Sequence, residues 1–349
     1  MKGLTIRALV LAAGEGRRLR PLTQHLPKPL LPAAGQSVLA QTLNQLERIG
    51  CEAVALNLHH CGERIERRIG ESWGDLQVVY SREEELLGTL GALVPLRAFF
   101  SGCDLALLVN GDSLCRWPLE RMVRQQVKHS PQATLLCLSG VEPEAYGGGI
   151  GLDANQRVVQ FRQTGPQTGP AKVRRVFGGA HVLSRELLDR LPHDARPSDI
   201  VGDLYQPLLQ SGAAFRAVTT ARAWHDLGTP ERYLRGVLDW SRGRRPLRWV
   251  RSNWVSSSAR IGRGVRLKGA CIEAGATVEA GARLRRVVAL PGAQIGAGAR
   301  LTDAIVGPNV VIPEGSSVER RMVTSLADGR RDEGGDSVLG QLVFSPIEP

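Results

Sequence analysis

Four charged side chains stand in short motifs that could hold a phosphorylated ligand. Lys28 lies between two prolines, and Arg18 follows a turn that contains two glycines. Asp112 ends an apolar run in Val-Asn-Gly-Asp-Ser, and Asp226 lies in Trp-His-Asp-Leu-Gly-Thr-Pro-Glu. Arginine and lysine provide fixed positive charge for phosphates, and Mg²⁺ needs only one or two protein carboxylates because it keeps several waters. The sequence therefore predicts a site where these groups hold Mg²⁺ and phosphate oxygens.

Each aspartate also has an ordinary structural alternative. Asp112 could cap a turn or a helix, which is a common role of aspartate. Asp226 could cap the helix that we expect to begin near Pro230, but Thr229 is better placed for that role. The joint occurrence of the two aspartate motifs is more specific than either motif alone.

The glycine turn has the composition of an anion-binding loop. The apolar run Leu9–Ala13 precedes Gly14 and Gly16, and a glycine lets backbone N–H groups approach a phosphate because it has no Cβ. A dinucleotide fingerprint would need a third glycine where Leu19 stands, and a P-loop would end in Gly-Lys-Ser/Thr. The alternative is an ordinary strand and turn with a solvated basic face. The loop predicts a nucleotide site that includes Ala13, Gly14 and Gly16.

The elements around these motifs alternate between strands and helices. We expect strands at 53–58, 76–80 and 105–109, helices at 38–49, 62–69 and 89–100, and a closing helix at 231–240. This alternation predicts an α/β fold with a doubly wound, mostly parallel sheet. Ligands bind beyond the carboxyl ends of such strands, where Gly14 and the segment 110–112 fall.

The C-terminal part has a different period. Val255, Ile261 and Leu267 are six residues apart, and the spacing continues, with phase slips, to Val318 among many glycines. One inward aliphatic per six residues is typical of a solenoid of short strands, and the slips predict corner loops. We expect a first domain at 1–240, a basic linker at 241–251, the repeat domain at 252–324 and an irregular C-terminal cap or tail at 325–349.

Composition narrows the class of partner. The chain has 349 residues, a formal net charge of +11 and six scattered cysteines. The positive charge favours anionic ligands, and cysteines without metal-site spacing favour reduced thiols and a cytoplasmic location. No apolar run is long enough to cross a bilayer, so we expect no membrane partner. A nucleic-acid-binding role for the arginines at 242–251 remains an alternative, but a solvated linker is favoured.

The motifs together resemble those of the sugar-1-phosphate nucleotidyltransferases. These enzymes share Gly-x-Gly-x-Arg-Leu-x-Pro-Leu-Thr, Pro-Lys-Pro-Leu, Asn-Gly-Asp and Trp-x-Asp-Leu-Gly-Thr-Pro-Glu-x-Tyr, and within the family the mannose-1-phosphate guanylyltransferases are the most similar. The repeats resemble the hexapeptide repeats of left-handed parallel β-helices. The resemblance implies a Rossmann-like transferase fold followed by a β-helix, with Arg18, Lys28, Asp112 and Asp226 as catalytic residues and Mg²⁺ on the two aspartates.

The resemblance also implies the substrates and their binding residues. A nucleoside triphosphate, preferably GTP, would react with a hexose 1-phosphate, and the β-helix would mediate homo-oligomer contacts; no nucleic acid is expected. Glu85 could accept a hydrogen bond from a guanine amine or a ribose hydroxyl, whereas Thr89 could instead cap a helix. The implied nucleotide-binding residues are Ala13, Gly14, Gly16, Glu85, Gly88, Thr89, Asn110 and Gly111, and the implied sugar-binding residues are Gly147 and Gly179.

One motif departs from the family. The family usually has Phe-x-Glu-Lys-Pro, whose lysine holds the sugar phosphate, whereas this chain reads Phe-Arg-Gln-Thr-Gly from Phe161, so that Thr164 replaces the lysine. Arg162, Lys172 or Arg174 could supply the missing charge. Three readings therefore stay open besides the guanylyltransferase: a glucose-1-phosphate thymidylyl- or uridylyltransferase, a catalytically weakened nucleotide-binding regulator, and a nucleic-acid-binding protein.

Overall fold

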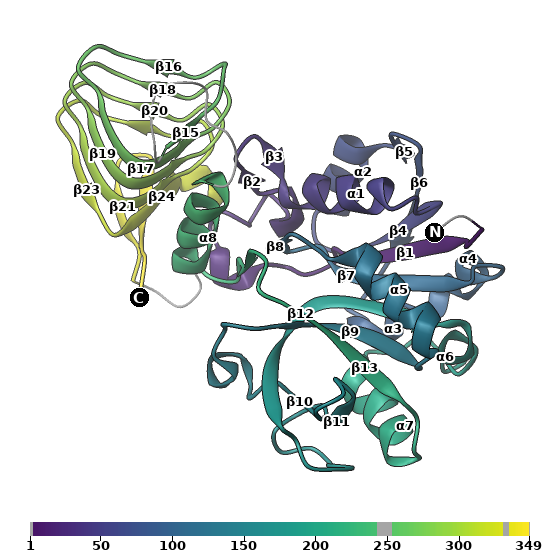
Figure 1. The fold of residues 1–349 in the computed structure, drawn as a ribbon. Coiled ribbons are helices and arrows are strands. Elements are labelled where there is room, and N and C mark those ends of the chain that lie inside the picture. The colour runs from purple at the N-terminus through teal and green to yellow at the C-terminus, as the bar shows by residue number, and fades with distance from the viewer. Residues whose placement is uncertain (1–2, 243–252, 331–334, 349) are drawn as a thin grey trace. The chain divides into compact units, whose positions relative to one another are not determined.

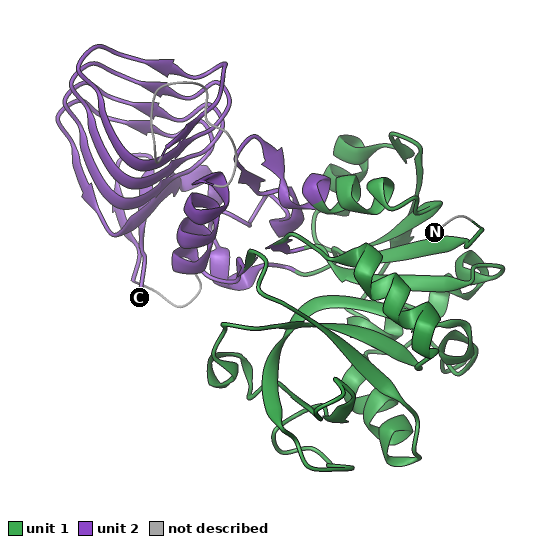
Figure 2. Ribbon diagram, in the orientation of Figure 1, with its two compact units in different colours: residues 1–14, 42–111, 115–224 green, residues 15–41, 112–114, 225–349 purple. Residues whose placement is uncertain are grey.

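The computed structural model of the chain describes residues 3–242, 253–330 and 335–348. It divides into two compact units (Figure 2). Unit 1 comprises residues 1–14, 42–111 and 115–224, and unit 2 comprises residues 15–41, 112–114 and 225–349. The chain thus passes into unit 2 directly after Gly14, Gly111 and Trp224. Of the predicted linker 241–251, the first two residues end a helix and the remainder lies outside the described residues.

A ten-stranded sheet forms the centre of unit 1 (Figure 1), with β11-β10-β12-β7-β1-β4-β6-β5 in order and with β9 joining β12 to β13. Neighbouring strands β7, β1, β4 and β6 are parallel, whereas β12 is antiparallel to β7. The predicted α/β class with a mostly parallel core is confirmed. The strands are β1 (Ile6–Leu11), β4 (Ala53–Leu58), β5 (Ser72–Trp73), β6 (Leu76–Arg82), β7 (Leu105–Asn110), β9 (Ala133–Leu138), β10 (Ile150–Leu152), β11 (Val158–Gln160), β12 (Val173–Ser184) and β13 (Phe215–Thr220).

One predicted helix is interrupted. The segment 89–100 forms α3, a 3-10 turn (Val94–Leu96) and α4, because Pro95 has no N–H to donate to the preceding turn. The helices are α1 (Val38–Arg48), α2 (Gly62–Ile69), α3 (Gly88–Gly91), α4 (Arg97–Phe100), α5 (Leu119–His129), α6 (Arg185–Asp189), α7 (Gln206–Gln210) and α8 (Pro230–Arg242).

Unit 2 contains the predicted parallel β-helix (Figure 1). Leu267 pairs with Leu284 and Leu284 with Leu301, so that each coil takes 17 residues rather than three full hexads. Two sides of each coil therefore have six residues, and the third side has five. At that corner the backbone is left-handed, with φ of +65° at Gly269, +53° at Arg286 and +50° at Asp303. The predicted phase slip is thus a regular tight corner inside a continuous strand, not a loop.

The strands of unit 2 and the short strands near its motifs have the following bounds. They are β2 (Pro32–Ala33), β3 (Gln36–Ser37), β8 (Ser113–Cys115), β14 (Trp224–Asp226), β15 (Trp254–Val255), β16 (Arg260–Ile261), β17 (Arg266–Ile272), β18 (Thr277–Val278), β19 (Arg283–Ala289), β20 (Gln294–Ile295), β21 (Arg300–Val306), β22 (Val311–Ile312), β23 (Ser317–Glu319), β24 (Arg321–Ser325), β25 (Ser337–Leu339) and β26 (Leu342–Pro346).

A second hydrophobic core joins the β-helix to α8. The inward residues of the coils, such as Ile272 and Val306, form the interior of the β-helix. The residues that precede them in the sequence point to the opposite face of the strands and form a separate stripe. This stripe consists of Cys271, Val288, Ile305 and Met322, all fully buried. This stripe shares one cluster with the apolar face of α8 and with residues from the segment 19–38. The β-helix, α8 and residues 19–38, which we call the Lys28 segment, therefore have a common core.

The C-terminal residues add to the β-helix. Strand β26 pairs antiparallel with β24, and β25 pairs antiparallel with β26. Val343 is fully buried and Ile347 nearly so. The segment expected to be irregular is thus partly a two-stranded extension of the sheet. In the part of the chain that the structure describes, no helix is both long and apolar enough to cross a membrane.

Candidate active site

Lys28 lies between the two predicted aspartates. Its ammonium Nζ is 2.6 Å from Asp112 Oδ2 and 3.9 Å from Asp226 Oδ1. The lysine side chain is only 7% exposed, whereas the Asp112 side chain is 41% exposed. The two carboxylates therefore converge on one point in unit 2, with the lysine on the buried side and Asp112 accessible from solvent.

Local sequence explains how these three side chains are held. Lys28 begins a 3-10 turn whose second residue is Pro29, and Leu31 N–H closes the turn on the Lys28 carbonyl at 3.0 Å. Asp112 immediately precedes β8 and Asp226 ends β14, and these two strands pair with each other. The pairing of two short strands brings together aspartates that are far apart in the sequence.

The helix after Asp226 takes its cap from Thr229. Arg232 N–H donates to Thr229 Oγ1 at 3.3 Å at the start of α8. This is the cap that the sequence favoured, and it leaves the Asp226 carboxylate available to the cationic groups around it. Asp226 accepts instead from the Arg232 guanidinium and faces Lys28.

Two arginines complete the charge cluster. Gly228 lies under Arg18, because a Cβ at Gly228 would be 2.7 Å from Arg18 Nη2 and 3.0 Å from Asp226 Oδ1. Arg18 is exposed, so its guanidinium remains available to an anion beside Asp226. Arg232 was not predicted; its signal was its position one turn into the helix that follows the aspartate motif. Three cations and two carboxylates thus form one cluster in unit 2.

The donor set of this cluster suits a hard cation. Asp112 and Asp226 offer only carboxylate oxygens, the ligand type that Mg²⁺ prefers, and Mg²⁺ retains waters in its remaining positions. Within the described residues, no group of three or more His, Cys, Asp and Glu side chains is arranged to hold a metal. The arrangement fits a cation held by two carboxylates and by a ligand's oxygens, and it does not fit a structural metal site.

The glycine loop is built around backbone contacts. In unit 1, Ala12 N–H at the end of β1 donates to Asn57 Oδ1 at 2.7 Å, and Gly14 has open space where a Cβ would stand. Ala13 is buried. In unit 2, Gly16 has φ +64°, and a Cβ there would be 3.2 Å from Thr23 Cγ2. The left-handed backbone at Gly16 favours glycine, whereas Gly14 is exposed and has space for a side chain.

A buried polar relay in unit 1 was missed by sequence reasoning. Asn57 Nδ2 donates to Glu83 Oε1 at 2.9 Å, and Glu83 Oε2 accepts from Leu87 N–H at 3.0 Å. With the Ala12–Asn57 bond, this relay ties the end of β1 to the segment that carries Glu85. The signal was an asparagine inside the otherwise apolar strand β4. Glu85 itself is exposed, as a residue that contacts a ligand must be.

Gly88 and Thr89 have structural contacts within unit 1. A Cβ at Gly88, which has φ +72°, would be 2.6 Å from the Ser198 carbonyl oxygen. Thr89 Oγ1 accepts from Ile200 N–H at 2.9 Å, while the cap of α3 is Leu87. Thr89 therefore does not cap its own helix; it holds the segment 198–200 against the loop.

Asn110, Gly111 and Gly179 lie together at one end of the central strands. Gly111 N–H donates to the Leu11 carbonyl at 2.9 Å, and a Cβ at Gly111 would be 2.7 Å from that oxygen. A Cβ at Gly179, which has φ +79°, would be 3.0 Å from Asn110 Nδ2. Side chains at both positions would therefore displace the carboxyl ends of β1 and β7, where the sequence placed the ligand.

A pocket of about 320 Å³ in unit 1 contains the predicted sugar-binding glycine Gly147. Phe161, Arg162, His181 and Tyr205 also line it. His181 Nδ1 is 3.0 Å from the Tyr205 hydroxyl, and burial lowers the pKa of His181 to about 3. The imidazole is therefore neutral near pH 7, and the pocket's positive charge comes from Arg162.

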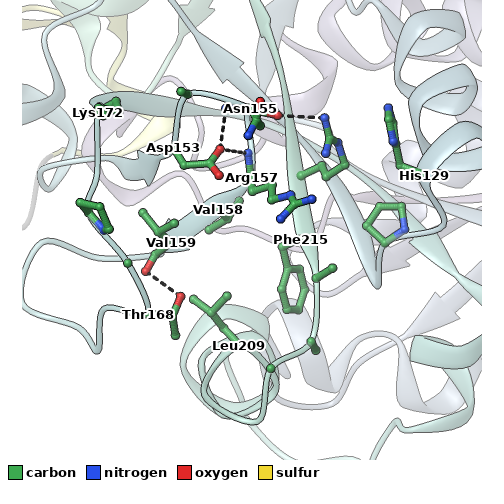
Figure 3. Close-up of a pocket in the computed structure, with 18 residues that line it drawn as sticks. His129, Asp153, Asn155, Arg157, Val158, Val159, Thr168, Lys172, Leu209 and Phe215 are labelled. Carbon is green, nitrogen blue, oxygen red and sulfur yellow. Dashed lines mark hydrogen bonds between the residues drawn. The ribbon is translucent and has the colours of Figure 1, made fainter.

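The three cations that could replace the family's lysine have different surroundings. Arg174 donates to the Gly148 carbonyl at 2.6 Å, the Gly149 carbonyl at 2.8 Å and Gln160 Oε1 at 2.7 Å, so that its guanidinium orders the glycine turn. Lys172 lines another pocket, of about 690 Å³ (Figure 3). Arg162 alone of the three lines the pocket of Gly147, where it pairs with Asp199.

Comparison with known proteins identifies the family. A family model described as nucleotidyl transferase matches residues 7–241. The chain belongs to the nucleotidyl transferase family. A second model, described as a GlmU-like C-terminal hexapeptide, matches residues 247–328. This nucleotidyl transferase thus carries the repeat domain that its sequence period and its 17-residue coils indicate.

Relatives of this nucleotidyl transferase include two kinds of enzyme. It is 31% identical over 291 residues to a mannose-1-phosphate guanylyltransferase of Mycobacterium tuberculosis, covering 76% of this chain and 79% of the relative. It is 29% identical to a UTP–glucose-1-phosphate uridylyltransferase of Synechocystis, covering 67% of this chain and 63% of that protein. Against the Xenopus tropicalis mannose-1-phosphate guanylyltransferase catalytic subunit beta it spans 64% of the relative's length.

A solved structure supports the fold. The crystal structure of HddC from Yersinia pseudotuberculosis superposes with a TM-score of 0.55 and 21% sequence identity, covering 67% of this chain and 99% of that chain. At this identity the similarity concerns the fold alone.

Proposed function

We propose that the chain transfers a nucleotidyl group from a nucleoside triphosphate to a sugar 1-phosphate, which gives a nucleotide sugar and pyrophosphate. The observation that carries the proposal is the convergence of Asp112 and Asp226 on the buried ammonium of Lys28. The curated relatives of both kinds carry names of this reaction class.

In the proposed reaction, an oxygen of the sugar phosphate attacks the α-phosphorus. A bond forms between that oxygen and phosphorus while the bond to the bridging oxygen breaks, and pyrophosphate leaves with the electron pair. A sugar phosphate is already anionic at neutral pH, so the step needs no general base. When bound, Mg²⁺ would act as a Lewis acid that offsets charge on the triphosphate. Asp112 and Asp226 would hold it.

The cationic residues would orient and stabilise the phosphates. Arg18 is exposed next to Asp226, where it can reach phosphate oxygens, and Lys28 is fixed by a proline-bounded turn. Preorganised charges of this kind act where negative charge develops in the transition state. Backbone N–H groups at Ala13, Gly14 and Gly16 would take the remaining phosphate oxygens, since no Cβ stands over the two glycines.

We further propose that Arg162 binds the sugar phosphate in place of the family's lysine. It lines the pocket of Gly147, and its partner Asp199 is half exposed, so a dianionic phosphate can compete for the guanidinium. The catalytically weakened regulator was an alternative because the family's lysine is missing. A phosphate-binding Arg162 would supply that positive charge and so argues against this alternative.

The preferred substrates are GTP and mannose 1-phosphate, with the product GDP-mannose. They are the substrates that the Mycobacterium relative's name implies, and that relative has the highest identity of those above. The second candidate is a glucose-1-phosphate uridylyl- or thymidylyltransferase, which the Synechocystis relative favours. Glu85, the proposed acceptor for a guanine amine, is the residue by which the two bases would be distinguished.

The β-helix is the proposed surface for self-association. Val311, on the sheet formed by β16, β18, β20 and β22, is 51% exposed, and its register partner Gln294 is exposed as well, so both face outward. We propose contacts between copies of the chain there. We expect a cytoplasmic location because all six cysteines are free thiols. Sedimentation of Val311→Lys against the unchanged chain tests the association, which a charged side chain in an apolar contact should weaken.

The experiment that tests the reaction is a screen of pyrophosphate release. GTP, UTP, dTTP and ATP are each incubated with mannose 1-phosphate or glucose 1-phosphate, with Mg²⁺ or with EDTA. We expect pyrophosphate only with Mg²⁺ and fastest with GTP and mannose 1-phosphate. If pyrophosphate release is fastest with UTP or dTTP and glucose 1-phosphate, the chain is the second candidate, a glucose-1-phosphate uridylyl- or thymidylyltransferase. If the chain binds a triphosphate but turns over no pair of triphosphate and sugar 1-phosphate, the proposed reaction is contradicted.

A further inference from the structure

The turn between β2 and β3 is bonded to the β-helix within unit 2. Gly35 N–H donates to Glu273 Oε2 at 3.0 Å. Glu273 follows β17 directly and is 1% exposed, although its side chain carries a carboxylate. Burying a charged group is unfavourable unless it is hydrogen-bonded. The hydrogen bond from Gly35 N–H joins the β-helix to the Lys28 segment. Its loss would leave the buried Glu273 carboxylate without this donor, which is unfavourable.

A second contact fixes the same turn. A Cβ on Gly35 would lie 2.8 Å from Trp254 Cζ2, so the indole of the first coil rests directly on the glycine backbone. Gly35 has φ +85°, a conformation that side-chain-bearing residues rarely adopt. Only glycine satisfies both conditions. The turn is therefore shaped to receive Trp254 and Glu273 together.

The strand that leads to the turn is held from α8. The Tyr233 hydroxyl donates to the Pro32 carbonyl at 2.6 Å. Leu31 is fully buried in the same core as Cys271 and Val288 of the β-helix. Three points therefore fix the short segment that directly follows the turn of Lys28: the core around Leu31, the bond at Pro32 and the bond at Gly35.

Lys28 is connected rigidly to this anchored segment. Its 3-10 turn includes Pro29 and ends at Leu30, and Val38 N–H closes the hairpin on the Leu31 carbonyl at 3.1 Å. A proline-bounded turn leaves few soft dihedrals between the ammonium and the hairpin. A displacement of the hairpin relative to the β-helix would therefore move the Lys28 ammonium relative to Asp112.

We infer that Glu273 and Trp254 of the β-helix are positioning residues for Lys28. The inference rests on the proposed role of Lys28 in nucleotidyl transfer and assigns the β-helix a part in that reaction besides self-association. Neither residue touches the reacting groups; each acts by fixing the Gly35 turn. The alternative is a purely structural contact, in which Glu273 only satisfies a buried N–H.

The test compares Glu273→Ala with Glu279→Ala in the full chain. Glu279 is an exposed glutamate on the following side of the same coil, so it controls for the loss of one negative charge. We expect Glu273→Ala to lower kcat about tenfold or more, since misplacing a catalytic group by about 1 Å can cost up to about 100-fold. Glu279→Ala should keep the kcat of the unchanged chain. Glu273→Gln should keep most of the parental kcat, because its amide oxygen can accept the hydrogen bond from Gly35 N–H.

Two further measurements separate positioning from structure. In a Lys28→Ala background, Glu273→Ala should have no additional effect on the residual kcat, because the two changes act through one group. Hydrogen exchange of the peptide 28–37 should be faster in Glu273→Ala than in Glu279→Ala. If Glu273→Ala does not fold, Trp254→Leu takes its place, with the same expected results.

The outcomes distinguish this inference from the proposed function. An active parent chain with an unchanged kcat in Glu273→Ala and in Trp254→Leu would overturn the positioning role and leave the reaction intact. Unchanged exchange of the peptide 28–37 would overturn it as well. A parent chain without turnover on any substrate pair would overturn the proposed function, and the exchange measurement would still decide whether Glu273 fixes the turn.

Discussion

The Lys28 ammonium lies 2.6 Å from a carboxylate oxygen of Asp112, although the two residues are 84 positions apart in the chain. Asp226 Oδ1 lies 3.9 Å from the same ammonium. A buried lysine between two carboxylates is well compensated in the absence of ligand, which lowers the desolvation cost of its charge. When a triphosphate and its cation bind, the same three groups can exchange partners without moving far.

Asp112→Asn should abolish most of the turnover while leaving the fold intact. The amide keeps the shape of the side chain but removes one of the two carboxylates proposed to hold Mg²⁺, so we expect kcat to fall about 100- to 1,000-fold. Asp189→Asn, at an exposed aspartate paired with Arg185 on α6, is the matched control. Pyrophosphate release at saturating Mg²⁺ measures both. Near-parental kcat in Asp112→Asn would contradict the metal role.

The sequence indicated the convergence of Lys28, Asp112 and Asp226 through the joint occurrence of their motifs. The place of Asp112 after the parallel strand β7 follows from the sheet rule, whereas the pairing of the short strands β8 and β14 brings Asp226 to it. Arg232 and the Asn57–Glu83 relay were missed because their partners come from tertiary packing. Their sequence signals, a helical arginine and a polar residue in an apolar strand, are common and have many other causes.

Periodicity predicted the β-helix but not its contacts. The six-residue spacing indicated the inward aliphatics, while the five-residue side of each coil appeared only as a phase slip. The stripe of Cys271, Val288, Ile305 and Met322 recurs every 17 residues, and it lies next to the inward residues, where a hexad count does not expect apolar side chains. What covers that stripe is α8, a fact of tertiary structure that the repeat itself cannot encode.

Arg162→Ala should raise the KM for the sugar 1-phosphate and leave the KM for the triphosphate nearly unchanged. Loss of a charge-assisted hydrogen bond to a phosphate costs roughly 1.5–3 kcal/mol, which is about 10- to 100-fold in affinity. Lys172→Ala is the control, because Lys172 lines a different pocket of unit 1. Initial rates with each substrate varied in turn measure the two constants. An equal rise in both variants would contradict the assignment to Arg162.

His181 should make the fold less stable as the pH falls below about 6.5. Burial lowers its pKa to about 3 in the folded chain, whereas the unfolded chain has the ordinary value near 6.5. Between these values the unfolded state binds a proton that the folded state does not, so stability is complete above pH 6.5 and declines below it. At pH 5 the loss is about 2 kcal/mol.

Chemical unfolding at pH 7 and pH 5 checks this dependence. The chain with His181→Gln lacks the titrating group, so the part of the pH dependence that His181 causes should disappear. His193→Gln is the control because His193 is an exposed histidine outside this pocket. Equal pH dependence in the parent and in His181→Gln would show that the imidazole is not held neutral by burial.

Ile305→Ala should destabilise α8 together with the β-helix. Ile305 is fully buried in the core that contains Val237 of α8, and truncation of such a side chain costs about 2–5 kcal/mol. Leu339→Ala, at a largely exposed position of β25, should change the free energy of unfolding by no more than about 0.5 kcal/mol. Because Ile305 and Val237 belong to one core, the double variant with Val237→Ala should be non-additive by about 0.5–3 kcal/mol. Additive losses would mean that Ile305 and Val237 do not interact with each other, which would contradict the packing of α8 on this stripe.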